Sequence, residues 1–216
     1  MLRIALRALS SALLCVAAIA YAQDFSADVF NTTAKDAAKS GKVYVKGNKM
    51  RIDRGDASAE ESAPMVLVDM DSNTVTIMDA TNHVYMKTGI EPEQGLSFFR
   101  LKDANNACAE LEKMSGMSGC KKAGNETVNA RQTVKYAGKS KDGNPITVWA
   151  DTEVSFIVKW QPKTGETGEL RNIKVAPQAD NSFTIPSGYH NAVKEADTET
   201  DTDKKDTKEE PPSTPQ

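Results

Sequence analysis

Hydrophobic and polar residues alternate along residues 42–87, and short turn-forming sequences interrupt the alternation. Such alternation is typical of strands with one covered face, because successive side chains of a strand point to opposite sides. Tight turns are expected at Gly47–Asn48, Asp71–Asn73 and Ala80–Asn82. The stretch therefore predicts an antiparallel meander. Its apolar face would carry Val43, Val45, Met50, Ile52, Val75, Ile77, Val84 and Met86.

Similar patterns predict further strands outside the meander. These are residues 24–31, 126–136, 146–151, 154–160, 169–175 and 183–186. Residues 32–40 are polar and suit a loop or a weak helical turn, and residues 55–64 suit an exposed loop. The pattern as a whole predicts a mainly β (α+β) fold, a curved antiparallel sheet or half-barrel of about nine to eleven strands with one or more covering helices.

A helix is expected over residues 104–114, where small and apolar residues recur at helical spacing. Ala104, Ala107, Leu111 and Met114 form its apolar stripe, and Gly116 with Gly119 would end it. A helix in this position could cover the apolar face of the sheet, either as a fixed cover or as a moving lid.

Residues 1–22 have the organisation of a secretory signal peptide, an apolar run followed by the small-residue pattern Ala20–Ala22. Cleavage is expected after Ala22, which predicts a periplasmic protein. A lipoprotein signal with Cys15 as the lipidated residue is the alternative. Residues 23–190 are then one domain, and residues 191–216 are a disordered acidic tail rich in Pro and Thr. No later stretch is apolar over a length that would span a bilayer.

The charge of the chain is concentrated in its tail. Residues 194–216 contain eight acidic residues and four lysines, against a formal net charge of −3 for the whole chain. The folded part is therefore close to neutral. This argues against a nucleic-acid-binding protein, which needs a basic face.

Two cysteines, Cys108 and Cys120, remain after removal of the signal peptide. An even pair in an exported chain predicts a disulfide. A metal site or a redox pair is the alternative, but the spacing is not C-x-x-C, and no nearby histidine completes a ligand set.

The motifs of common catalytic and cofactor sites are missing. The chain contains two histidines, His83 and His190, and neither a G-x-S-x-G elbow nor a phosphate-binding glycine loop. We therefore expect that the protein is not an enzyme and that it binds neither a cofactor nor a metal. The methionines leave one alternative open, Cu(I) binding through His83 and Met86 or through Met114 and Met117. Their place in the strand pattern favours core or cavity lining instead.

Several motifs, taken in order, resemble the LolA/LolB-like superfamily of periplasmic lipoprotein carriers, and an uncharacterised bacterial branch of it. The motifs are G-x-V-Y-V-x-G-x-K-M-R at residues 41–51, V-D-M-D at 68–71, V-Y-M at 84–86, C-x-x-x-G-x-E-x-V-N-x-R at 120–131, W-x-D at 149–151 and F-x-I-P-x-G-Y at 183–189. Ala130 stands where that branch usually has glycine. The resemblance implies a half-barrel whose helices cover its concave side around an apolar cavity, which takes acyl chains in the lipoprotein carriers.

These observations predict an exported protein that shelters a lipid, an acyl chain or another apolar ligand, with a lipoprotein or envelope protein as a possible partner. The candidate cavity residues are Val45, Met50, Ile52, Leu67, Ile77, Met86, Phe98, Phe99, Val148 and Phe156. Trp149 and Trp160 are expected to be core or rim aromatics. The alternative is an envelope interaction protein whose interior is packed and which holds its partner at a sheet edge or on the convex face.

Overall fold

The computed structural model describes residues 23–33, 36–55, 64–90, 97–163 and 166–192. The predicted signal peptide, most of the predicted loop over 55–64 and nearly all of the predicted tail lie outside the described residues. Within them no helix is both long enough and apolar enough to cross a membrane.

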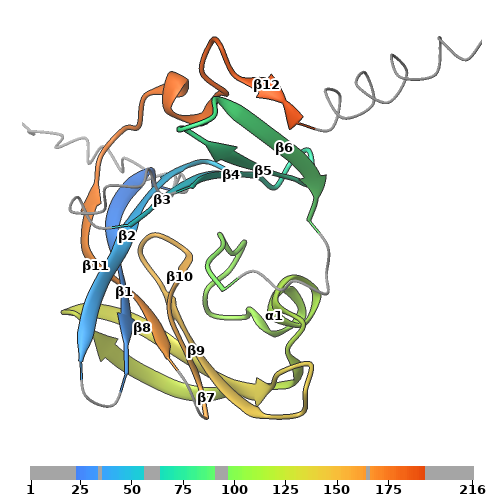
Figure 1. The fold of residues 1–216 in the computed structure, drawn as a ribbon. Coiled ribbons are helices and arrows are strands. Elements are labelled where there is room, and N and C mark those ends of the chain that lie inside the picture. Colours follow the sequence, from blue (N-terminus) through green and yellow to red (C-terminus); the bar gives the residue numbers. More distant parts are fainter. Residues whose placement is uncertain (1–22, 34–35, 56–63, 91–96, 164–165, 193–216) are drawn as a thin grey trace, which may run out of the picture.

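Twelve strands form one curved sheet in the order β12-β6-β5-β4-β3-β2-β1-β11-β10-β9-β8-β7. Figure 1 shows the sheet bending into an open half-barrel, with helix α1 (Cys108–Ser115) on its concave side. Neighbouring strands are antiparallel except β12 and β6. The predicted half-barrel with a covering helix is confirmed. The strands are β1 (Phe25–Thr32), β2 (Ala37–Lys46), β3 (Lys49–Arg54), β4 (Met65–Asp69), β5 (Thr74–Asp79), β6 (Val84–Gly89), β7 (Ser118–Val128), β8 (Arg131–Lys139), β9 (Pro145–Asp151), β10 (Phe156–Pro162), β11 (Thr167–Val175) and β12 (His190–Asn191).

The register of β2 to β5 places the predicted apolar residues on one face. Val45 pairs with Met50, Met50 with Val68, and Val68 with Val75. Because partners in an antiparallel pair project to the same side of the sheet, these side chains form one continuous apolar surface on the concave face.

Strand β2 begins earlier than the sequence indicates. Residues 37–40 belong to it, whereas the polar pattern predicts a loop or helical turn over 32–40. Alanine and lysine are weak strand formers, but Ala37 pairs with Thr32 and Ala38 with Asn31. Pairing with β1 therefore decides the local conformation, because it provides hydrogen-bond partners for the backbone N–H and C=O groups of these residues. This outweighs the weak strand preference of alanine and lysine.

The prediction of a single strand over 126–136 is wrong, because a two-residue turn separates β7 from β8 within this range. Asn129 and Ala130 both have positive φ, 48° and 62°. Two consecutive left-handed residues form the turn type that suits the twist of a β-hairpin. Asparagine adopts this conformation readily, but alanine rarely does, and the sequence therefore hides the turn.

Replacement of Ala130 by glycine should stabilise the protein by about 1 kcal/mol, because a left-handed alanine is strained and glycine is not. Both turn residues are exposed, so no packing is lost. Urea unfolding of the two proteins measures the difference. Ala109→Gly is the control, since Ala109 is exposed in helix α1 without a positive φ, and glycine should destabilise the protein there. Equal stability of Ala130→Gly and the parent would contradict the strained turn.

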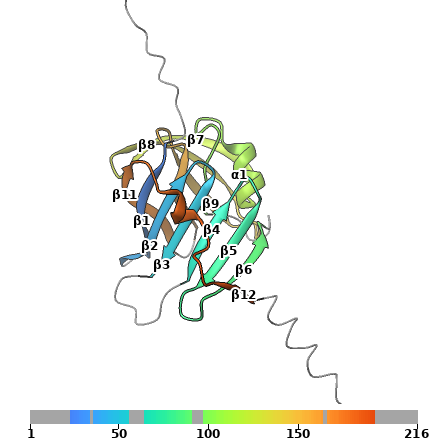
Figure 2. The ribbon, with the colours of Figure 1, turned by 90° about the horizontal axis from the view of Figure 1, so that it is seen from above.

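The strand predicted over 183–186 is also wrong. Residues Asp180–Phe183 form a short 3₁₀ helix (η1), and the chain then runs to β12. This C-terminal segment crosses the convex side of the sheet (Figure 2). Lys46 fixes it there through the carbonyl oxygen of Gln178 at 3.0 Å and the carboxylate of Asp180 at 2.8 Å.

Helix α1 is shorter than predicted and begins at Cys108 rather than at 104. The buried hydroxyl of Tyr136 accepts a hydrogen bond from the amide of Ala107 at 3.1 Å and donates one to the carbonyl of Ala104 at 2.8 Å. These bonds hold the preceding residues in turns instead. The helix ends at Gly116 with φ 65°, as predicted.

The predicted disulfide is present, with 5.4 Å between the Cα atoms of Cys108 and Cys120. Cys120 lies on strand β7, however, and not in a loop after the helix. Gly119 belongs to the same strand and does not end the helix. The disulfide therefore ties α1 to the edge strand of the sheet.

Candidate functional site

Among the described residues, the segment that covers the concave face lies over one half of the sheet. Residues 97–107 and α1 pack against β7 to β10, in a core cluster that includes Phe99, Leu111 and Tyr136. The amide of Leu101 donates to Ser155 O at 2.8 Å, and the amide of Ile157 donates to Phe99 O at 3.1 Å. This half of the interior is therefore an ordinary packed core.

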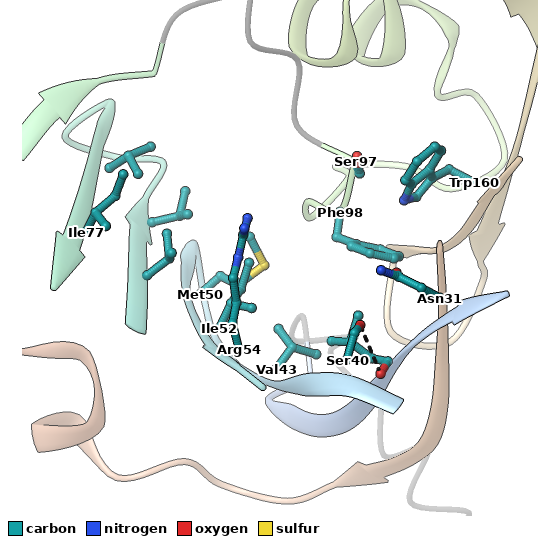
Figure 3. Close-up of a pocket in the computed structure, with 14 residues that line it drawn as sticks. Asn31, Ser40, Val43, Met50, Ile52, Arg54, Ile77, Ser97, Phe98 and Trp160 are labelled. Atoms are coloured by element: carbon teal, nitrogen blue, oxygen red, sulfur yellow. Dashed lines mark hydrogen bonds between the residues drawn. The ribbon is translucent and has the colours of Figure 1, made fainter. Parts of the chain in front are cut away.

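The other half of the concave face borders a cavity of about 590 Å³. Figure 3 shows it between the wall formed by β2 to β5 and the side chains of Phe98 and Trp160. Its volume is typical of small-molecule sites. Ten of the fourteen lining residues are apolar. The apolar ones are Val29, Val43, Met50, Ile52, Val66, Val68, Val75, Ile77, Phe98 and Trp160, and the polar ones are Asn31, Ser40, Arg54 and Ser97.

The apolar surface continues beyond the cavity towards the edge of the sheet. Ile77 on β5 pairs with Met86 on β6, and the two side chains are 39% and 44% exposed. Single exposed apolar residues are common, but a contiguous apolar wall that water can reach is typical of a binding surface. The face could therefore contact an apolar ligand as well as enclose one.

Three of the four polar lining residues gather at one end of the wall. Asn31 is close to the end of β1, Ser40 occupies the bulge of β2, and Arg54 is the last residue of β3. These ends adjoin because the strands are antiparallel neighbours, and the amide of Gly55 donates to Ser40 O at 3.0 Å. The cavity thus has a long apolar part and one polar end.

Trp160 closes the cavity opposite β3. Its strand partner is Gly168, and Gly168 pairs in turn with Asn31, so the three residues form one row across β10, β11 and β1. A Cβ atom on Gly168 would lie 2.7 Å from Cε2 of the indole. The absence of a side chain at Gly168 therefore lets the indole lie flat over β11.

Replacement of Gly168 by alanine should push the indole of Trp160 towards the cavity. We expect a loss of about 1–3 kcal/mol in the free energy of unfolding, the usual cost of overpacking, and weaker binding of an apolar probe. Gly138→Ala is the matched control, since its Cβ would lie 2.7 Å from Cγ of Met117, outside the cavity lining. Equal effects of both variants on probe binding would show that Trp160 does not limit the cavity.

Arg100 fixes the covering segment at its start. Its guanidinium donates to three backbone oxygens, Gly47 O at 2.6 Å, Gln23 O at 2.9 Å and Val154 O at 3.0 Å. Burial lowers the pKa of Arg100 below its usual value. One side chain thus connects the residues just before β1, the β2–β3 turn and the β9–β10 turn, and it holds Phe98 and Phe99 in place.

The predicted cavity residues fall into four groups. Met50, Ile52, Ile77 and Phe98 line the cavity. Val45, Phe99, Val148 and Phe156 are buried in the two core clusters, and Met86 extends the apolar wall. Leu67 lies between Val66 and Val68 on β4, so its side chain is on the opposite face of the sheet.

Sequence reasoning missed Val66, Val68, Trp160 and the polar end of the cavity. The residues of β4 that face the cavity could have been found by aligning the alternation of β4 with that of β5, since Val66 pairs with Ile77. The sequence predicts a core or rim position for Trp160, and the indole lines the cavity wall. No sequence signal indicates that Asn31, Ser40 and Arg54 meet at one end, because that depends on the register of three strands.

The described residues contain no group of three His, Cys, Asp or Glu side chains close enough to hold a metal ion. Met117 is buried in the core, and Met114 packs beside it. The cavity can shield an apolar ligand from water and can offer it polar contacts at one end.

No protein-family model matches the chain, and no curated protein is similar to it in sequence. Solved structures share its fold. The structure of PNGF-II is similar with a TM-score of 0.51 and 10% identity over 81% of this chain. This chain covers 32% of PNGF-II, about a third of its length.

An uncharacterized conserved protein from Thermus thermophilus is similar at the same TM-score of 0.51, with 8% identity, over 80% of this chain and 91% of that one. The structure of MucB in complex with MucA(peri) has a TM-score of 0.45 with 10% identity, over 78% of this chain and 56% of that one. At these identities the similarity concerns the fold alone. The curved sheet with its covering helix agrees with the half-barrel that the sequence motifs predict.

Proposed function

We propose that the protein is an exported carrier or binding protein that shelters an apolar ligand, such as the acyl chain of a lipid, against β2 to β5. The observation that carries the proposal is the cavity of about 590 Å³ with ten apolar lining residues. A packed interior would leave no such space, because protein cores are filled to the density of organic crystals.

Two further observations support this function. The apolar wall remains exposed at Ile77 and Met86, which costs solvation unless a ligand covers it. The sequence motifs resemble carriers that hold acyl chains, and the signal-like residues 1–22 favour the periplasm. Release of a bound lipid to a partner in the envelope would complete such a role.

Binding of the neutral fluorescent probe N-phenyl-1-naphthylamine to the purified protein tests the proposal. We expect saturable binding to one site. Ile77→Glu should weaken it at least tenfold, because a carboxylate in the wall must lose water when the probe binds. Lys87→Glu is the matched control: Lys87 is exposed on the same strand pair but on the opposite face.

Native mass spectrometry of protein purified gently from its own envelope gives the second test. A co-purified lipid at fixed stoichiometry, lost in Ile77→Glu, would support the carrier role. No probe binding and no bound lipid, together with a stoichiometric protein partner, would overturn it in favour of an envelope interaction protein.

A further inference from the structure

Arg54 places a positive charge on the wall of a mainly apolar cavity. It follows Met50 and Ile52 at two-residue spacing on β3, so all three side chains project from the same face. Figure 3 shows the guanidinium beside these two residues, directed into the space between the sheet and Phe98. Asn31 and Ser40 lie at the same end of the cavity.

Arg54 differs from the other arginines that the structure describes. Arg51 is paired with Asp53, Arg131 with Asp151 and Arg171 with Glu169, while Arg100 binds three carbonyl oxygens. No described residue forms an ion pair or a hydrogen bond with the Arg54 side chain. An arginine usually satisfies its planar donors with a carboxylate or a phosphate, which it can bind through two parallel hydrogen bonds.

We infer that the ligand is an amphiphile with an anionic head, a carboxylate or a phosphate, and that Arg54 binds this head while the alkyl chain lies along β2 to β5. The inference rests on the proposed function and specifies its ligand. The separation of a polar end from a long apolar wall matches a molecule with one charged end and one apolar tail. Asn31 and Ser40 add neutral hydrogen-bonding groups beside the charge.

Arg54 is exposed at the end of its strand, so its replacement should leave folding nearly unchanged. Removal of a charge-assisted hydrogen bond should weaken binding of an anionic amphiphile about tenfold or more. The affinity for a neutral amphiphile of the same length should not change, because that ligand makes only the apolar contacts. Comparison of the two ligands separates the contribution of the head to the affinity from that of the tail.

The experiment measures displacement of N-phenyl-1-naphthylamine by hexadecanoate, hexadecyl phosphate and hexadecanol from the parent protein, Arg54→Gln and Arg51→Gln. Arg51→Gln is the matched control, since it removes the same charge from the same strand but on the opposite face. We expect both anions to bind the parent more tightly than hexadecanol does, and Arg54→Gln alone to lose that preference. The tighter anion identifies the head as carboxylate or phosphate.

Two outcomes would overturn the inference while the proposed function stands: equal affinity of the parent for anions and hexadecanol, or an anion preference that persists in Arg54→Gln. A parent protein that does not bind N-phenyl-1-naphthylamine would instead overturn the proposed function itself. Arg54→Lys provides a further check, because it keeps the charge and should retain part of the preference.

Discussion

Replacement of Asp151 by alanine is expected to lower the free energy of unfolding by about 3–5 kcal/mol, the usual cost of removing one partner of a buried ion pair. The side chain of Asp151 is fully buried at the end of β9. Its carboxylate accepts hydrogen bonds from the guanidinium of Arg131 and from the amides of Glu153 at 2.8 Å and Val154 at 3.0 Å. It therefore connects the start of β8 with the turn that leads into β10.

The loss is large because several groups would be left without partners. The side chain of Arg131 is only 18% exposed, and the hydrogen bond to Asp151 raises its pKa above the usual value. Without that carboxylate the guanidinium keeps its charge in a poorly solvated place, and two backbone amides lose their acceptor. Urea unfolding followed by circular dichroism measures the difference.

Glu153→Ala is the matched control for this prediction. Glu153 also contacts Arg131, at 3.1 Å, but its side chain is 60% exposed. Exposed ion pairs contribute about 0–1 kcal/mol, so this variant should remain close to the parent. Equal losses in Asp151→Ala and Glu153→Ala would show that burial of the carboxylate is not what matters.

Removal of the disulfide by the double replacement Cys108→Ser and Cys120→Ser should cost about 3 kcal/mol. The two residues are 12 positions apart, so the bond mainly restricts a short loop of the unfolded chain. It also connects α1 with β7, whose residues are mostly exposed and which has no strand on its other side among the described residues. We therefore expect that removal of the disulfide accelerates amide hydrogen exchange more in α1 and β7 than in β2 to β5.

Reductant supplies the control for the disulfide prediction. Dithiothreitol should destabilise the parent to the level of the double variant and should leave the double variant unchanged. If the parent and the double variant unfold at the same urea concentration without reductant, the bond does not stabilise the folded protein.

The meander could be predicted because its signals are local. The alternation of Met50 and Ile52 and the turn at Gly47–Asn48 act over a few residues, and tertiary packing reinforces them. Residues 37–40 and the 129–130 turn were missed because pairing with a distant strand, or a strained backbone, overrides the preference of those residues. Even the W-x-D motif indicated only a resemblance, and not that its Asp151 is a buried anchor.

Side-chain period, turn chemistry and cysteine pairing are enough to predict the fold class, the hairpins of the meander, the disulfide and the presence of one apolar face. Which part of that face is core and which part borders the cavity follows from long-range packing. The covering segment packs against β7 to β10, and the cavity borders β2 to β5. The meeting of Asn31, Ser40 and Arg54 brings together the ends of three strands. These depend on strand register and on contacts between residues far apart in the chain, which no local pattern encodes.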